Sequence, residues 1–258
     1  MINKLASVSS AASIGEGVTV EPFSSIYEDV VIGKGAHIGP NVTIYPGTRI
    51  GENVQVFPGA VIGAVPQDLK FSGEYTTVEI GDNTIIRECA TIHRGTSDKL
   101  KTVVGKNCLI MGYVHIAHDC RIGNNVILAN YVGLSGHVTI DDYAILEGKV
   151  AAQQFMHIGA HSFIAGASLI RKNVPPFIRA AREPLSYAGI NAVGMRRRNF
   201  SEDDIKLVEN IYRLLFVQNN NITKGLQSLS DELPDSKLKT MVIDFIKGSE
   251  KGIIRGLM

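Results

Sequence analysis

A six-residue repeat runs through most of this chain. Between positions 14 and 170 almost every sixth residue is aliphatic, and only Asp68, Glu74 and Asp98 interrupt the series. A period of six fits neither an α-helix nor an alternating strand, but it is typical of a parallel β-helix of stacked triangular coils. We therefore predict three hexads per coil, so that residues one coil apart are vertical neighbours. The aliphatic positions are Ile14, Val20, Ile26, Ile32, Ile38, Ile44, Ile50, Val56, Ile62, Ile80, Ile86, Ile92, Val104, Ile110, Ile116, Ile122, Leu128, Leu134, Ile140, Leu146, Ala152, Ile158, Ile164 and Ile170.

The repeat divides the chain into two predicted domains. Residues 1–176 form the β-helix, with aliphatic residues pointing inward and Gly, Asn and Asp residues at the corners. Pro175 and Pro176 end it, and we expect irregular, basic backbone over 177–199. Residues 177–258 hold this connector and an α-helical domain that caps the open end of the solenoid. Its helices are expected over 201–217, 223–229 and 236–247.

Composition excludes several classes of function. Lys plus Arg total 26 against 25 for Asp plus Glu, so the net charge of +1 indicates no bulk affinity for nucleic acid. The three cysteines show no paired spacing, which argues against a disulfide framework and a cysteine zinc site. No apolar run reaches the roughly 18 residues of a membrane span, and no signal-peptide core precedes the repeat. We expect a cytoplasmic protein without membrane insertion.

Two polar, turn-rich segments interrupt the repeat without shifting its phase, at 64–77 and 94–101. In a solenoid such insertions leave the coil as loops on one face, which is often the binding face. The alternative is tolerated decoration of the surface.

The histidines are the first candidates for chemistry. His118 and His137 are one residue more than a coil apart, so we expect them on one edge, and Gln154 continues the same column. Asp119 follows His118 and can accept its ring N–H, which would fix the tautomer and raise the basicity of the ring. The alternative for each histidine is a solvated corner residue. We assign structural roles to His37, His157 and His161.

Zinc is a further alternative, because three histidines from adjacent coils can surround a tetrahedral metal. His115 and His118 are three residues apart, whereas the zinc carbonic anhydrases of this fold use a spacing of five. We therefore predict no metal.

A basic cluster lies near the end of the repeat. Met195–Arg198 is dense in positive charge for a near-neutral protein, and Arg171, Lys172, Arg179 and Arg182 add to it. Such a cluster can hold phosphates or an acidic carrier protein, and the alternative is an ordinary solvated surface.

Five segments together carry a resemblance to a known family. They are "GAVPQDLKF" (63–71), "TIHRGT" (91–96), "HIAHDC" (115–120), "LSGHV" (134–138) and "GINAVGMRRRNF" (189–200). The chain, helical tail included, resembles the UDP-N-acetylglucosamine O-acyltransferase family of the first step of lipid A biosynthesis.

The resemblance implies a homotrimer of left-handed β-helices with active sites in the clefts between subunits. It implies transfer of a 3-hydroxyacyl chain to the 3-hydroxyl of the glucosamine ring of UDP-N-acetylglucosamine. The acyl group arrives as a thioester on the phosphopantetheine of acyl carrier protein, so no metal or diffusible cofactor is expected.

The resemblance also assigns residues. His118 is the expected general base, Asp119 its orienting partner, and the backbone N–H of Gly136 the oxyanion donor one coil above. Gly166 falls where the family sets acyl chain length, and a glycine there predicts a long chain of about fourteen carbons or more. The expected substrate contacts are Asp68, Lys70, His93, His115, His137, Gln154, Asn191, Arg197 and Arg198.

Two positions depart from the family pattern, since many relatives have His in place of Gln153 and an acidic residue in place of Val193. Four rival functions remain open: transfer to a 3-amino UDP-sugar, the N-acyltransferase of the same pathway, an acetyl-CoA-dependent hexapeptide acetyltransferase, and a non-catalytic scaffold. The N-acyltransferases carry a uridine-binding domain for which we expect no room before Ile14. The acetyltransferases lack the "QDLK" loop and the long helical tail, and a scaffold needs no aligned His, Asp and Gln.

Overall fold

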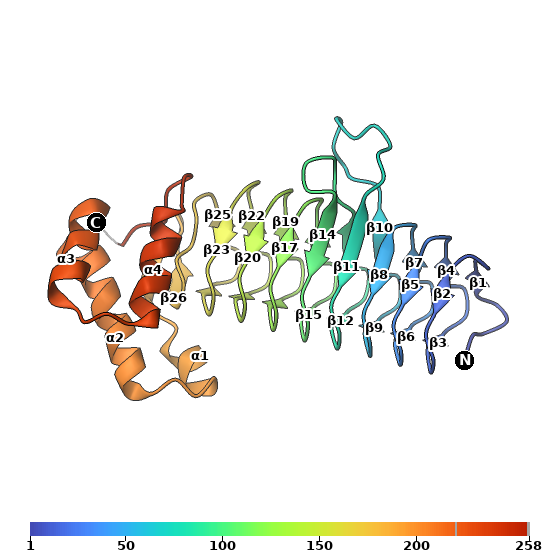
Figure 1. Ribbon diagram of the computed structural model, residues 1–258, viewed down its shortest axis with the longest axis horizontal. Coiled ribbons are helices and arrows are strands. Elements are labelled where there is room, and N and C mark those ends of the chain that lie inside the picture. Colours follow the sequence, from blue (N-terminus) through green and yellow to red (C-terminus); the bar gives the residue numbers. More distant parts are fainter. Residues whose placement is uncertain (220, 257–258) are drawn as a thin grey trace.

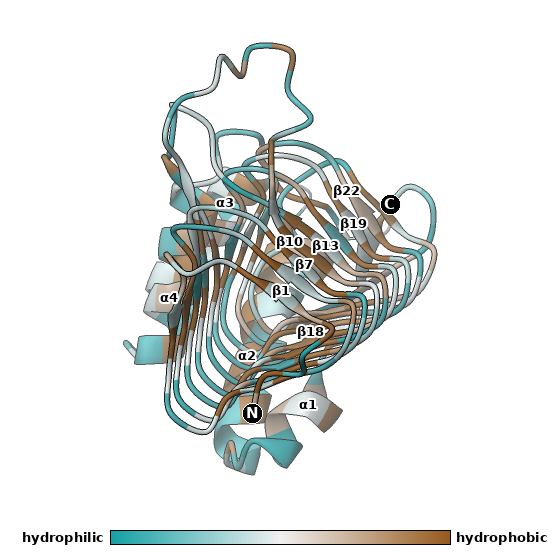
Figure 2. Cartoon of the chain, turned by 90° about the vertical axis from the view of Figure 1, so that its right-hand side faces the viewer, coloured by the Kyte–Doolittle hydropathy of each residue, from teal (hydrophilic) through white to brown (hydrophobic). Residues whose placement is uncertain are grey.

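The computed structural model describes residues 1–219 and 221–256. The hexads form a left-handed parallel β-helix in which each coil adds one short strand to each of three sheets (Figure 1). Seen along the axis the three sheets are the walls of a triangular prism (Figure 2). The predicted fold class is confirmed.

The three sheets contain nine, eight and ten strands. The nine-stranded sheet contains β1 (Ser7–Val8), β4 (Ser25–Ile26), β7 (Thr43–Ile44), β10 (Val61–Ala64), β13 (Thr91–His93), β16 (His115–Ile116), β19 (Gly133–Leu134), β22 (Ala151–Ala152) and β25 (Leu169–Ile170). The eight-stranded sheet contains β2 (Ser13–Ile14), β5 (Val31–Ile32), β8 (Thr48–Ile50), β11 (Thr77–Ile80), β14 (Lys101–Val104), β17 (Arg121–Ile122), β20 (Thr139–Ile140) and β23 (His157–Ile158). The ten-stranded sheet contains β3 (Thr19–Val20), β6 (His37–Ile38), β9 (Gln55–Val56), β12 (Ile85–Ile86), β15 (Leu109–Ile110), β18 (Ile127–Leu128), β21 (Ile145–Leu146), β24 (Phe163–Ile164), β26 (Ile178–Ala181) and β27 (Ser186–Ile190).

Strand register follows the hexad phase. Ile116 of β16 pairs with Leu134 of β19, which lies one coil of 18 residues further on. Both side chains are fully buried, as are those of most in-phase aliphatic residues. A slip of one residue would turn these aliphatic side chains outward, so their burial fixes the register.

Both interruptions of the repeat leave the prism at the same edge. The first excursion joins β10 to β11, and the second joins β13 to β14. Each therefore leaves the edge between the nine- and eight-stranded sheets, and both project from the solenoid (Figure 1). Because the residues expected to be catalytic lie along it, this edge is called the catalytic edge below.

Helices cover the C-terminal end of the solenoid (Figure 1). A capping box opens α2, because Ser201 and Asp204 each accept a hydrogen bond from the other's backbone N–H. The predicted continuous helix over 201–217 is wrong in its second half, where the backbone widens into a π-helix. The helical segments are α1 (Ala192–Arg197), α2 (Glu202–Tyr212), the π-helix η1 (Arg213–Gln218), α3 (Ile222–Glu232) and α4 (Lys237–Lys247).

The expectation of irregular backbone over 177–199 is also wrong. Strand β26 pairs with β24, and β27 pairs antiparallel with β26, so the sheet continues beyond Pro176. The two prolines break the hexad phase, but Ile178–Ala181 still finds an unpaired strand edge to extend. The hydroxyl of buried Tyr212 donates a hydrogen bond to the Pro176 carbonyl, which ties α2 to the last coil.

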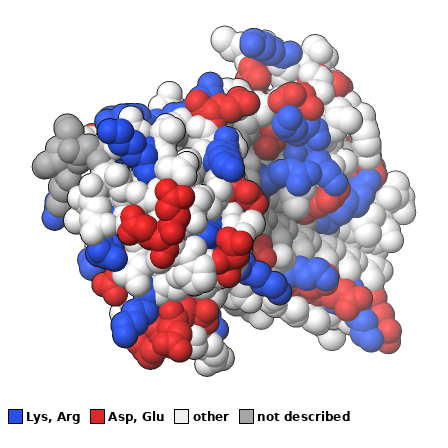
Figure 3. Space-filling view, turned by 60° about the vertical axis from the view of Figure 1, so that its left-hand side comes forward, with Lys and Arg blue, Asp and Glu red and all other residues white. Residues whose placement is uncertain are grey.

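Basic and acidic side chains are interspersed on the face that Figure 3 shows. None of the helices in the described part of the chain combines the length and apolarity needed to cross a bilayer.

Candidate active site

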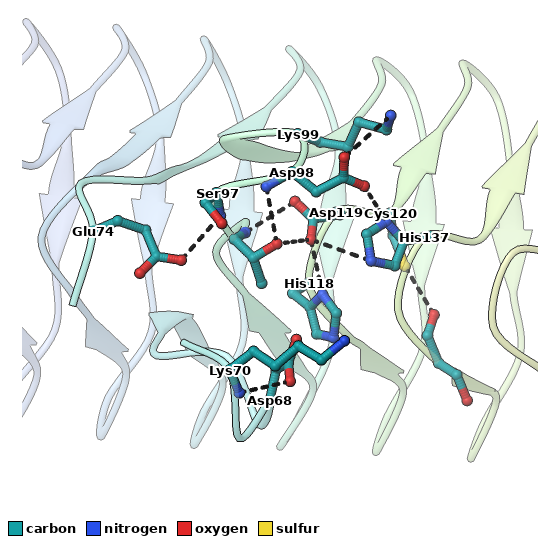
Figure 4. Close-up of polar contacts among 12 residues, drawn as sticks. Asp68, Lys70, Glu74, Ser97, Asp98, Lys99, His118, Asp119, Cys120 and His137 are labelled. Carbon is teal, nitrogen blue, oxygen red and sulfur yellow. Dashed lines mark hydrogen bonds and ion pairs between the residues drawn. The ribbon is translucent and has the colours of Figure 1, made fainter. Parts of the chain in front are cut away.

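The candidate site lies on the catalytic edge (Figure 4). Within it, Asp119 is the residue that hydrogen bonds hold most firmly. The Asp119 side chain is fully buried and accepts three hydrogen bonds. Thr96 donates its backbone N–H to Oδ1 over 2.9 Å and its hydroxyl to Oδ2 over 2.6 Å, and His118 donates from Nδ1 to Oδ2 over 2.8 Å. Burial alone would raise the pKa of this carboxyl, but the hydrogen bonds from Thr96 and His118 outweigh burial and lower it. Asp119 is therefore a fixed carboxylate anion.

His118 is held in one tautomer by this carboxylate. An ionised carboxylate only accepts hydrogen bonds, so Nδ1 of His118 carries the proton and Nε2 offers a lone pair. The His118 side chain is 6% exposed, which shields the ring from bulk water. The arrangement suits proton abstraction by Nε2.

Gly136 lies directly against the His118 ring, one coil above it. A Cβ atom built on Gly136 would stand 2.6 Å from Nε2 and 2.5 Å from Cε1 of His118. Any side chain at this position would therefore collide with the ring. The Ser135 N–H donates to the Ala152 carbonyl, and the His137 N–H donates to the His118 carbonyl. The Gly136 N–H between them donates to no group within 1–219 and 221–256. Within the described residues, Gly136 thus presents an N–H without a protein acceptor next to the His118 ring.

His118, His137 and Gln154 lie on one edge, as expected, but His137 is offset by one residue from the column that holds the other two. The strict coil register places Gly136 and then Gln154 over His118, and His137 over Asp119. The His137 ring still meets the His118 ring edge-on, with centroids 5.1 Å apart, and it stacks on Phe155 at 4.6 Å. Its Nε2 lies 3.6 Å from Asp119 Oδ2. His137 is thus beside the pair, whereas Gln154 is exposed further along the edge.

Two more predicted residues lie next to the pair on the nine-stranded sheet. The rings of His93 and His115 meet edge-on with centroids 5.0 Å apart, and His115 Nδ1 shares a hydrogen bond of 2.8 Å with the Thr91 hydroxyl. Burial, with repulsion from His115, lowers the pKa of His93 to about 4. Burial and the nearby His118 also lower the pKa of His115. Near neutral pH these rings are therefore uncharged.

The first excursion brings Asp68 and Lys70 to the same side of the solenoid as His118 (Figure 4). Asp68 Oδ1 accepts a hydrogen bond of 3.0 Å from the Lys70 backbone N–H, which leaves the exposed Lys70 ammonium free to reach an anion.

The remaining predicted residues lie elsewhere on the prism. Asn191 caps α1 by accepting from Gly194 N–H, and its amide donates to the His161 carbonyl over 2.8 Å. Together with Arg197 and Arg198 it lines a pocket of about 330 Å³ that includes outward side chains of the ten-stranded sheet. Arg198 also donates to the carbonyl of Tyr143, over 2.8 Å.

Gly166 lies on a third edge, between β24 and β25. A single chain therefore presents two separate groups of candidate residues, those on the catalytic edge and those of the α1 pocket, and Gly166 is not among the residues that line that pocket. Elsewhere in the basic cluster Arg171 pairs with Glu183, and Arg196 pairs with Glu202.

His118, Asp119 and His137 are close enough to share a metal ion, since one ligand atom from each lies within 4.8 Å of the others. A cation there would displace the hydrogen bonds that the Asp119 oxygens already accept from Thr96 and His118. The geometry thus fits a hydrogen-bonded pair, and the metal-free site stays a prediction.

Sequence reasoning gave no role to Thr96 or Phe155. Thr96 stands in the "TIHRGT" segment, but nothing in its spacing from Asp119 signals a contact across the excursion. Phe155 follows His137 by one coil, and that spacing could have revealed the stack.

Comparisons with known proteins agree with this geometry. A family model described as UDP-N-acetylglucosamine O-acyltransferase, domain 2, matches residues 173–254, and one of bacterial transferase hexapeptides matches 11–46 and 101–136. An acyl-(acyl-carrier-protein)–UDP-N-acetylglucosamine O-acyltransferase from Burkholderia mallei (strain SAVP1) is 42% identical over 199 residues, covering 75% of this chain and 76% of that protein.

Two solved structures extend the likeness to the whole chain. The UDP-N-acetylglucosamine acyltransferase of Bacteroides fragilis 9343 superposes with a TM-score of 0.97 at 45% identity, covering 99% of this chain and 100% of that one. The corresponding structure from Acinetobacter baumannii gives a TM-score of 0.94 at 39% identity, with coverage of 98% and 99%.

A left-handed hexapeptide solenoid with a buried His–Asp pair and a free backbone N–H on one edge defines an acyltransferase of the hexapeptide-repeat class. The similarity over three quarters of the chain is specific within that class. The chain belongs to the acyl-(acyl-carrier-protein)–UDP-N-acetylglucosamine O-acyltransferase family.

Proposed function

We propose that this protein transfers a 3-hydroxyacyl chain from acyl carrier protein to the 3-hydroxyl of UDP-N-acetylglucosamine, as the first step of lipid A biosynthesis. Family membership supports the substrates, and one observation supports the chemistry: the His118 ring lies directly against Gly136, whose N–H has no acceptor in the described part of the chain. No metal or diffusible cofactor takes part.

Each step has a group in place. His118 Nε2 takes the proton of the sugar 3-hydroxyl as its oxygen attacks the thioester carbonyl carbon. Negative charge moves to the carbonyl oxygen, which accepts a hydrogen bond from the Gly136 N–H. The C–S bond then breaks, and the phosphopantetheine thiolate takes the proton back from His118. Because the solenoid holds Gly136 in place before charge develops, little reorganisation is needed.

The two separate groups of site residues support a homotrimer. One chain cannot bring the α1 pocket to its own catalytic edge, but a neighbouring copy can. The outer face of the ten-stranded sheet carries five large apolar side chains on successive coils, all partly exposed, and such a stripe is typical of a protein interface. The stripe consists of Ile85, Leu109, Ile127, Ile145 and Phe163. In the homotrimer Asn191, Arg197 and Arg198 of one subunit contact the nucleotide at the His118 of the next.

Shared sites predict complementation between two inactive variants. H118A and the double variant R197A/R198A should each lack activity alone. In trimers mixed at random from equal amounts, a cleft is intact only when one subunit supplies His118 and its neighbour the arginines, so about a quarter of the clefts should work. Rate measurement on the unselected co-expressed mixture checks this. Purification through two affinity tags keeps only trimers that hold both variants, and in these one cleft of the three should work. A mixture no more active than either variant would contradict sites shared between subunits.

Acyl chain length and acceptor can be measured together. Gly166 lies one coil above Gly148, whose carbonyl oxygen would stand 3.2 Å from a Cβ at 166, and its N–H donates to the Glu147 carboxylate over 3.0 Å. Gly166 itself adds no side chain to this edge. With acyl carrier protein loaded with chains of different length, mass spectrometry should show faster transfer of chains of about fourteen carbons or more than of ten. Preference for ten carbons would contradict the Gly166 assignment. A faster reaction with a 3-amino UDP-sugar would contradict UDP-N-acetylglucosamine as the acceptor. Transfer to neither acceptor would contradict the proposed acyltransferase function.

A further inference from the structure

Thr96 holds the Asp119 carboxylate at both oxygens. Its backbone N–H reaches Oδ1 at 2.9 Å and its hydroxyl reaches Oδ2 at 2.6 Å, and the threonine itself is 7% exposed. A carboxylate that is hydrogen-bonded at one oxygen can rotate about the Cβ–Cγ bond, whereas one that is hydrogen-bonded at both oxygens cannot. Thr96 therefore fixes the plane of the carboxylate that His118 must meet.

A fixed plane matters here because two imidazoles compete for the same oxygen. His118 Nδ1 lies 2.8 Å from Asp119 Oδ2, and His137 Nε2 lies 3.6 Å from it. A small rotation of the carboxylate would exchange one partner for the other. If His118 lost its acceptor, its proton could move to Nε2, and that nitrogen could no longer act as a base.

Hydrogen bonds within and next to the second excursion hold Thr96 in place. Its turn closes with a hydrogen bond of 2.8 Å from Leu100 N–H to the Thr96 carbonyl. The next residue, Ser97, donates its N–H to Glu74 Oε1 over 3.0 Å (Figure 4). Because Glu74 belongs to the first excursion, which also carries Asp68 and Lys70, the two excursions are joined into one unit next to the base.

We propose that Thr96 is a positioning residue for the catalytic pair, acting through Asp119 to keep His118 in the tautomer that can accept the sugar proton. This inference rests on the proposed role of His118 as general base. The threonine contacts no reacting atom, so its effect should fall on kcat rather than on KM.

The test compares T96V, which keeps the shape but loses the hydroxyl, with T96S, which keeps the hydroxyl. Full base catalysis is worth about 10²–10⁴-fold, and a disturbed tautomer forfeits part of it, so T96V should lower kcat by about 10- to 50-fold. We expect KM for UDP-N-acetylglucosamine to stay within about threefold and T96S to stay close to wild type. If T96V does not fold, T96A replaces it in the same comparison.

The matched control is T102V. Thr102 is a buried threonine on β14 whose hydroxyl has no hydrogen-bond partner in the described chain, so its loss should leave kcat unchanged. Thermal unfolding of all variants separates loss of activity from loss of fold.

A second readout does not depend on turnover. With histidine labelled by heavy nitrogen, NMR should show His118 as a single Nδ1–H tautomer in wild type and T96S, and as a mixture in T96V, with H118Q assigning the signals. A T96V enzyme with wild-type kcat, or one whose kcat falls while the His118 signals stay unchanged, would overturn the inference. Absence of acyl transfer by the wild type would instead overturn the proposed function, since the NMR comparison needs no substrate.

Discussion

Replacing His118 with alanine should lower kcat by about 10²–10⁴-fold, because general-base catalysis typically contributes that much. The substitution removes Nε2, which offers a lone pair next to Gly136 while Nδ1 of the same ring donates to Asp119. The neighbouring His137 cannot substitute for it, since its ring stacks on Phe155 and belongs to the next coil. Steady-state kinetics with both substrates saturating measures the effect.

The matched control is H37A. His37 is an exposed histidine on β6 of the ten-stranded sheet, so its removal takes away an imidazole without touching the catalytic edge. Its kcat should equal that of the wild type. A folded H118A enzyme that keeps most of its activity would remove His118 from the mechanism. A wild-type protein without activity on either acceptor would favour the scaffold alternative.

Replacing Gly136 with alanine should reduce kcat by at least about 10²-fold, since a displacement of 1 Å at a catalytic group can cost that much. The added Cβ would stand 2.5 Å from Cε1 of His118, closer than non-bonded carbon atoms approach. Either the ring leaves its hydrogen bond with Asp119, or the backbone carrying the oxyanion donor moves. Both changes separate the base from the donor.

Gly133 supplies the control for this substitution. It lies in β19 of the same coil, and a Cβ added there meets no atom within 4 Å. G133A should therefore fold and react like the wild type, which distinguishes a specific clash from a general loss of glycine flexibility. Wild-type kcat in G136A, with the fold verified by circular dichroism, would show that the base tolerates displacement and would contradict the assigned geometry.

Most of the fold was predictable because one physical constraint repeats in every coil. An aliphatic residue at each sixth position must point inward, which determines the prism and the register. The same constraint placed both excursions on one edge, because each was inserted at the same phase of the repeat. After Pro176 the constraint ends, and for this reason β26 and β27 were missed.

The site was less predictable than the fold. Adjacency of His118 and Asp119 in sequence was enough to predict their hydrogen bond. The contact from Thr96 depends on how an irregular excursion closes, which no periodicity encodes. The offset of His137 from the column above His118 follows from its spacing of 19 residues, one more than a coil of 18. The α1 pocket is separated from the catalytic edge by the way the chain winds around the prism, which the spacing of these residues in the sequence does not reveal.

A crystal structure of the protein with bound UDP-N-acetylglucosamine tests most directly whether His118 and Gly136 act on one acyl-transfer centre. The 3-hydroxyl oxygen should lie within about 2.6–3.2 Å of His118 Nε2, the reach of a general base. The Gly136 N–H should face the space beside that hydroxyl where a thioester carbonyl fits. A sugar bound with its 3-hydroxyl turned away from His118, or seated away from the catalytic edge, would contradict the proposed mechanism.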